Sequence, residues 1–359
     1  MFDRPFHSPD QFRAAFLNGL SGLLRDPDLG SHILTHANAI FDEQIYASLR
    51  PALRESFNLL ADRCRDALLH GFGMGGSTDD QMVFLKLMAI GFEGLHTTEF
   101  RRLQDWELQF NHIRSFRPAR MSEQEVTSIS LPFNEQDFHF NKPHLRKEVF
   151  WAGEILGVSV ELLYNKFPFV PLHGLLVPDR EAQHPQLLNR RYHEFIWSLS
   201  EHLAEQLPGW GVGYNSFGAS ASVNHLHFQS FIRQQPLPIT EGHWQHNGGN
   251  RVYPLACETF TGHEAAWERL ETLHASQTSY NLIYLPGRLY CLPRKPQGSF
   301  SHATWSNGLA WYELAGCFTA FRHADFDSLD DEAVGTELSK LAVMNPGRTC
   351  QPPSSHSSR

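Results

Sequence analysis

The stretch ASVNHLHFQSFI, residues 221–232, places His225, His227 and Gln229 at alternate positions. In a β-strand, successive side chains point to opposite faces, so these three polar side chains would share one face. The residues between them are apolar and suit a hydrophobic core. The alternation therefore predicts a half-buried strand that carries two imidazoles and an amide in a row.

Such a row is costly to bury unless each polar group finds a partner. A lone histidine is more often a solvated or hydrogen-bonded residue than a functional one. Here two histidines and a glutamine lie together, preceded by Asn215 and a turn of small residues. We therefore expect the row to face a polar cavity.

The rest of the chain divides into a helical part and a strand-rich part. Residues 8–24 begin with Ser8 as a helix cap and Pro9 at the first helical position, followed by apolar residues at helical spacing. Residues 41–72 predict one or two further helices broken near Pro51, and residues 78–94 predict another. From about residue 106, short strand-like runs alternate with Pro, Gly and Asn.

Helices are predicted in residues 187–207 and 263–275, and a hairpin in residues 280–294 turns at Pro286-Gly287. Residues 311–321 read as a last strand. We expect an α+β fold with a helical N-terminal extension (1–105), a main domain (106–342) and a disordered tail (343–359).

The composition excludes several classes of protein. The chain has 359 residues and a formal charge of −9, without a basic block, which argues against nucleic acid or a membrane surface as a partner. Its five cysteines form no CxxC pair, so neither a zinc ribbon nor a disulfide framework is expected, and we predict no metal and no cofactor. No signal peptide or transmembrane run is evident, which predicts a cytoplasmic protein.

The His-x-His-x-Gln pattern resembles the active-site signature of the histidine triad superfamily, in the form found in galactose-1-phosphate uridylyltransferase and its relatives. Further segments resemble, in the same order, those of the GDP-hexose phosphorylases, a group that includes the GDP-D-glucose and GDP-L-galactose phosphorylases. These segments are FNHIRSFRPAR, PFNEQDFHFNK, NKFPFVPLHGLLVP, GYNSFGASASVNHLHFQSF, PLPI, YNLIYLPGRLYCLPR and WYELAGCFTAF. The resemblance covers about residues 106–342, and it implies a histidine triad fold of two related halves, with an antiparallel sheet flanked by helices.

The resemblance also implies roles for the motif. His227 would attack the α-phosphorus of a nucleoside diphosphate sugar and become a nucleotidyl-histidine. The main chain of His225 would hold the proton on the other ring nitrogen of His227. Gln229 would donate to a phosphoryl oxygen, and Asn215 and Ser222 would complete the phosphate cradle. The alternative for Ser222 is a turn hydroxyl, and the alternative for Asn215 is a strand-end cap.

Three further residues are candidates for substrate binding. Asn165 lies in the segment that resembles the nucleoside-facing strand pair, and Lys142 and Arg294 are candidate cations for phosphate. An ordinary solvated side chain is an equal alternative for each cation. His173 departs from the family pattern, because the order here is Leu172-His173-Gly174, and we interpret it as a packed or solvated histidine.

The leading hypothesis is an enzyme that converts a GDP-hexose or another nucleoside diphosphate hexose, plus phosphate, to the nucleoside diphosphate and hexose 1-phosphate. One alternative is a diadenosine polyphosphate phosphorylase or nucleotide hydrolase of the same superfamily. Another is a nucleotide-binding sensor without turnover, although binding alone needs no nucleophile. The sequence leaves the base, the sugar, the acceptor and the oligomeric state open, with a homodimer as one option.

Overall fold

The computed structural model describes residues 6–118, 126–306 and 308–343. Its largest element is a sheet of eight strands in the order β3-β4-β5-β7-β6-β9-β10-β8, in which every neighbouring pair is antiparallel. The strands are β3 (Val149–Ile155), β4 (Val158–Tyr164), β5 (Gly174–Pro178), β6 (Trp210–Asn215), β7 (Phe228–Ile232), β8 (Glu258–Phe260), β9 (Ser279–Leu285) and β10 (Arg288–Arg294).

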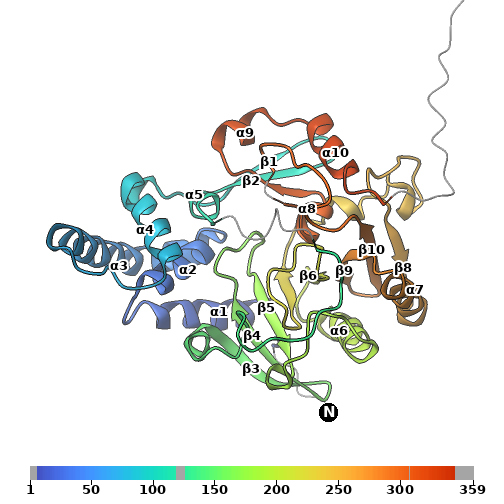
Figure 1. The fold of residues 1–359 in the computed structure, drawn as a ribbon, viewed down its shortest axis with the longest axis horizontal. Helices are drawn as coiled ribbons and strands as arrows, with labels where there is room; N and C mark the ends of the chain where they lie inside the picture. The colour runs from blue at the N-terminus through green and yellow to red at the C-terminus, as the bar shows by residue number, and fades with distance from the viewer. Residues whose placement is uncertain (1–5, 119–125, 307, 344–359) are drawn as a thin grey trace, which may run out of the picture.

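Helices flank this sheet, as the α+β prediction requires. Figure 1 shows one group of helices at the β3 end of the sheet and a second group with α6 beside the middle strands β6 and β9 and α7 near β8. The first group comprises α1 (Pro9–Leu23), α2 (Leu29–Ala39), α3 (Glu43–His70), α4 (Thr78–Ile90) and α5 (His112–Ser115). The second comprises α6 (Arg190–Leu203) and α7 (His263–Ala275). The α+β class and the antiparallel sheet are confirmed, whereas the relation between two halves stays a prediction.

A second, smaller sheet joins distant parts of the chain. It has the order β1-β2-β11, from β1 (Glu99–Arg102), β2 (Glu107–Phe110) and β11 (Cys317–Thr319), and β11 runs parallel to β2. The boundary predicted between residues 105 and 106 falls in the turn of the β1–β2 hairpin. The helices α8 (Trp311–Leu314), α9 (His323–Ser328) and α10 (Asp331–Ser339) surround this sheet.

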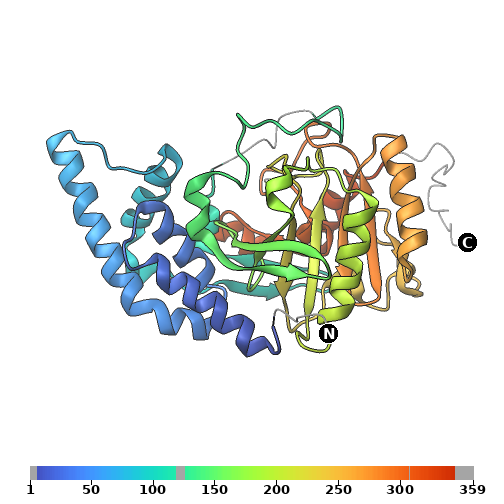
Figure 2. The same cartoon turned by 90° about the horizontal axis from the view of Figure 1, so that it is seen from below.

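The N-terminal helices pack directly on the main sheet. Ser8 caps α1 as predicted, because its Oγ accepts a hydrogen bond from the N–H of Gln11 at 3.2 Å. The buried side chains of Phe12 and Phe16 belong to the same hydrophobic cluster as Leu176 of β5. This shared core fixes the helices against the sheet. Figure 2 shows the N-terminal helices beside the strands from below.

Two predictions about elements outside the motif are wrong. The helix break expected near Pro51 does not occur, because α3 runs through Pro51 as one helix of 28 residues. Pro51 and Ala47, whose carbonyl loses its helical donor, are both exposed, so water can satisfy that carbonyl, while buried Leu49 and Leu53 anchor the helix on either side.

The last predicted strand is also shorter than expected. Its first four residues form α8, and only Cys317–Thr319 form β11. All seven of these residues are buried, so the run has no polar alternation to distinguish a helix from a strand.

The predicted tail at 343–359 lies outside the described residues, apart from residue 343. Within the ranges that the structure describes, no helix is both long and apolar enough to cross a bilayer.

Candidate active site

The residues of the opening motif lie where β7 begins. The strand starts at Phe228, so His225 and His227 precede it, whereas the sequence analysis predicted that they belong to it. His227 and Gln229 line a cavity of about 560 Å³, together with Asn215, Ser222, Asn165 and Arg294. His225 lies behind this lining and is 1% exposed. The structure thus brings together all but two of the candidate residues.

His227 is held with one ring nitrogen available. Its Nδ1 donates to the carbonyl oxygen of His225 at 2.8 Å. Burial lowers the pKa of His227 to about 4, although this hydrogen bond opposes the shift. The ring is therefore neutral near pH 7 with its proton on Nδ1, which leaves the lone pair on Nε2.

His225 supports the motif through its main chain and its ring. Its Nδ1 accepts from the N–H of Phe140 at 3.2 Å, and its Nε2 donates to the carbonyl of Arg180 at 3.1 Å. Burial is the main cause that lowers the pKa of His225 to about 4, and the neighbouring His227 is the second cause. The ring is thus a neutral structural group, and its carbonyl is the atom that contacts His227.

Gln186, which the sequence analysis missed, fixes the backbone of His227. Its Oε1 accepts from the N–H of His227 at 2.9 Å. Its Nε2 donates to the carbonyls of His227 at 3.1 Å and Asn215 at 2.9 Å. One side chain therefore ties the end of β6 to the start of β7.

Trp311 of α8 orients both amides of the cavity. Its indole N–H donates to Oε1 of Gln229 at 2.8 Å, and its backbone N–H donates to Oδ1 of Asn215 at 3.0 Å. Asn281 donates a second hydrogen bond to the same Oδ1 at 2.6 Å. Because both amide oxygens are engaged by donors, the NH₂ groups of Gln229 and Asn215 are the ends that can donate to a ligand.

Two buried arginines add positive charge to the cavity. Arg294 was a candidate, whereas Arg114 was not, although it lies in one of the segments that carry the family resemblance. Burial lowers the pKa of each guanidinium to about 9, with Glu313 opposing, so both stay protonated near pH 7. All three groups line the cavity, and one carboxylate cannot balance two guanidinium groups. This end of the cavity therefore suits an anion.

The remaining candidates take different places. Ser222 is exposed at the cavity wall, and Asn165 lies beside His173, with 3.4 Å between its Nδ2 and Nε2 of the histidine. His173 is fully buried, as the packed interpretation predicted. Lys142 does not line the cavity, because its Nζ donates to the carbonyl of Glu135 at 3.0 Å.

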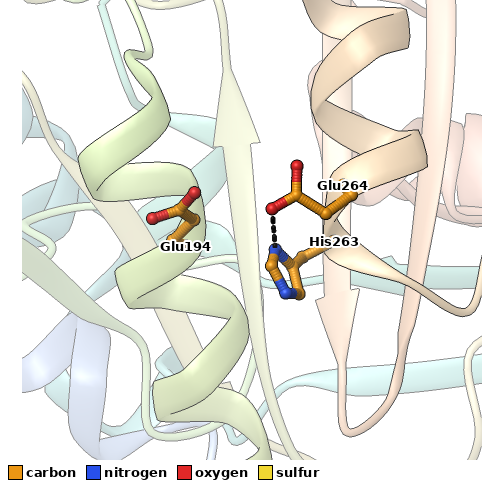
Figure 3. Close-up of side chains that lie close together, drawn as sticks. All are labelled: Glu194, His263 and Glu264. Carbon is orange, nitrogen blue, oxygen red and sulfur yellow. Dashed lines mark ion pairs between the residues drawn. The ribbon is translucent and has the colours of Figure 1, made fainter.

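The described residues contain one group with spacing suitable for a metal ion, far along the sequence from the motif. It consists of Glu194 of α6 with His263 and Glu264 of α7, whose ligand atoms lie within 4.8 Å of one another (Figure 3). Arg190 forms an ion pair with both carboxylates, at 2.7 Å to Glu194. One guanidinium therefore offsets only part of the negative charge of these two carboxylates.

Residues 104–231, which include the motif, match the family model described as GDPGP1-like, N-terminal domain. The chain is also similar to GDP-hexose phosphorylases. GDP-D-glucose phosphorylase 1 of Danio rerio is 32% identical over 121 residues, which are 33% of this chain and 34% of that protein. The Homo sapiens protein of the same name is 32% identical over 130 residues, covering 34% and 33% of the two chains.

GDP-L-galactose phosphorylase 1 of Arabidopsis thaliana is 28% identical over 154 residues, covering 36% of this chain and 32% of that one. The chain thus matches about a third of the length of these relatives, and the predicted resemblance to GDP-hexose phosphorylases is confirmed for that part. Among solved structures, yeast Ap4A phosphorylase Apa2 in complex with Ap4A aligns with a TM-score of 0.46 and 16% identity, covering 75% of this chain and 99% of that one.

Proposed function

We propose that this protein is a nucleotide-sugar phosphorylase that acts on a GDP-hexose. The observation that carries the proposal is the state of His227, a neutral imidazole with its proton held on Nδ1 and its Nε2 lone pair available at an anion-binding cavity. An imidazole in this state can attack phosphorus and leave again. The match of residues 104–231 to the GDPGP1-like model and the similarity of the chain to GDP-hexose phosphorylases support the choice of substrate.

The reaction has two displacements at one phosphorus. Nε2 of His227 attacks the α-phosphorus of the GDP-hexose, and the bond from that phosphorus to the bridging oxygen breaks. Hexose 1-phosphate leaves with the electron pair, and a guanylyl-histidine remains. An oxygen of inorganic phosphate then attacks the same phosphorus, the N–P bond breaks, and GDP forms. No metal, cofactor or redox step is part of this scheme.

The surrounding groups stabilise the charge that develops on the phosphoryl oxygens. The NH₂ groups of Gln229 and Asn215 donate to these oxygens, because their carbonyl oxygens are already held by Trp311. Arg114 and Arg294 supply the positive charge. We place Ser222 and Asn165 at the wall of this binding site. His225 is a positioning residue, because it acts through the proton on Nδ1 of His227.

The test is phosphate-dependent turnover of a panel of nucleoside diphosphate hexoses, with diadenosine tetraphosphate included. We expect GDP-glucose or a close relative plus phosphate to give GDP and hexose 1-phosphate, with ping-pong kinetics. After incubation without phosphate, intact-mass analysis should show a guanylyl adduct on the wild-type protein and none on His227→Ala. Release of GMP without dependence on phosphate would indicate a hydrolase instead, and a preference for diadenosine tetraphosphate would indicate the dinucleotide phosphorylase. Binding without any turnover would indicate a sensor.

The ligands and the cellular location of the protein belong to the same proposal. Its ligands would be a nucleotide sugar and inorganic phosphate, and the absence of a membrane-spanning helix among the described residues is compatible with a cytoplasmic enzyme.

A further inference from the structure

The cavity that contains His227 extends to a second wall, which the N-terminal helices build. Its lining includes Asp28 and Ser31 at the start of α2 and Asp80 at the start of α4. Lys147, Glu148 and Lys166, which lie just before β3 and just after β4, line the same region. The N-terminal helical segment, for which the sequence suggested no role, is thus part of the substrate cavity.

Two ion pairs in this wall hold the lysines that flank Glu148. Nζ of Lys166 lies 2.5 Å from Oδ1 of Asp80, and Nζ of Lys147 lies 2.6 Å from Oδ2 of Asp28. Both aspartates come from the N-terminal helices. Among the described residues, no group donates a hydrogen bond to the Glu148 carboxyl. Glu148 is therefore the acidic group of this wall that still needs a partner.

Electrostatics agree with this geometry. Burial raises the pKa of Glu148 to about 7, while Lys166 and Lys147 oppose the shift and Asp28 and Asp80 add to it. A buried carboxyl with negative neighbours is stabilised by hydrogen-bond donors that carry no negative charge of their own. The phosphates of a substrate are thus disfavoured here, whereas a neutral group with N–H or O–H donors is favoured.

The surfaces beside Glu148 are apolar. Leu145 and Leu163 line the cavity and belong to one hydrophobic cluster with Phe140, whose ring centroid lies 5.1 Å from that of His227. Leu163 pairs with Val149, the residue that follows Glu148. A purine has apolar faces and N–H donors on its edge, so it can meet both surfaces at once. A hexose, which carries hydroxyls around its ring, would leave some of them against the leucines without partners.

We propose that Glu148 determines base specificity by accepting hydrogen bonds from the edge of guanine, and that the N-terminal helices keep it available by pairing its two neighbouring lysines. This inference rests on the proposed function, in which the nucleotide belongs to a GDP-hexose. Guanine presents two adjacent donors, its ring N–H and its 2-amino group, and a carboxylate can accept from both. Inosine lacks the amino group, and adenine presents its amino group beside a ring acceptor.

The experiment measures the affinities of the full-length protein for GDP, IDP and ADP by calorimetry. Wild type should bind GDP most tightly. Glu148→Gln should lose about 10- to 100-fold in affinity for GDP, as expected for loss of hydrogen bonds to a charged group, and should no longer distinguish GDP from IDP. Glu154→Gln is the matched control, because Glu154 is an exposed carboxylate on the adjoining strand β3 and should leave all three affinities unchanged.

A second variant tests the role of the helices. Asp80→Asn should release Lys166 to pair with Glu148, and GDP should then bind more weakly while the melting temperature confirms the fold. Unchanged GDP affinity in Glu148→Gln would overturn the proposal. A loss of affinity for hexose 1-phosphate in place of GDP would overturn it too, since the hexose would then occupy this wall. Turnover of GDP-glucose by wild type, measured in parallel, reports separately on the proposed function.

Discussion

The hydrogen bond from Trp311 to Gln229 gives a sharp test of how the phosphoryl-binding amides are oriented. Trp311→Phe removes the indole N–H but keeps an aromatic ring in place. The backbone N–H of residue 311, which orients Asn215, is unaffected. The indole ring packs tightly against β6, because a Cβ on Gly213 would come within 2.2 Å of it. The smaller phenyl ring of the variant fits in the same space and can keep the packing against β6.

The expected size of the effect follows from the loss of one buried hydrogen bond of 2.8 Å. A net contribution of about 0.5–1.5 kcal/mol is typical, and a buried acceptor left unpaired costs about 1–3 kcal/mol. Without its donor, the Gln229 amide can turn its oxygen toward the phosphoryl group for part of the time. The upper limit is complete loss of that donor, about 10²–10³ in kcat. We expect kcat/KM for GDP-glucose to fall about 5- to 30-fold, which corresponds to roughly 1–2 kcal/mol of transition-state stabilisation.

The assay is steady-state phosphorolysis, with the same substitution repeated in a Gln229→Ala background. If Trp311 acts through Gln229, the second substitution should cost almost nothing once Gln229 is absent. Trp305→Phe is the matched control, since Trp305 is outside the cavity lining and packs on Phe318. An equal loss of activity in both backgrounds would refute the reasoning, because the tryptophan would then act on the fold or on another group.

Three further predictions concern the nucleophile, acid stability and metals. His227→Ala should lose at least ~10³-fold in activity with an unchanged circular dichroism spectrum, and activity within tenfold of wild type would contradict its role. Burial lowers the pKa of His36 in α2 to about 3, so the unfolded chain takes up a proton before the folded protein does. Stability should therefore fall by up to about 1.4 kcal/mol per pH unit as the pH falls from about 6.5 toward 3, and urea unfolding of His36→Leu should show a shallower dependence. Dialysis against a chelator should leave the melting temperature unchanged, and loss of stability together with a stoichiometric metal would disprove this.

The sequence pattern located the centre of the site even though it misplaced the strand. His227 and Gln229 face the cavity as predicted, whereas His225, which was expected to face it too, lies behind the lining because both histidines precede β7. Alternation of side chains between two faces holds only inside a strand, so it does not extend to residues that precede the strand. The likeness to a known family added the roles, which spacing alone does not provide.

The residues that orient the site could not be predicted in the same way. Trp311 reaches Gln229 across 82 positions and Asn215 across 96. Its own segment was read as a strand, which would have directed the indole elsewhere. Gln186 likewise looks like an ordinary loop residue until β6 and β7 are paired. Contacts of this kind depend on the packing of the whole fold, and a single sequence carries no local sign of them.

The charges at the two ends of the cavity explain why a nucleotide sugar would bind in one direction. Under the proposed function, two buried guanidinium groups share Glu313 in one part of the cavity, so this part carries excess positive charge. At the other end, two lysines meet three carboxyl groups, so no positive charge is left over for a phosphate. A substrate bound in reverse would place its diphosphate against those carboxyls and its neutral base against the arginines, which is unfavourable at both ends. In the proposed direction the α-phosphorus, which is the phosphorus closer to the base, lies between the base and the hexose 1-phosphate that leaves.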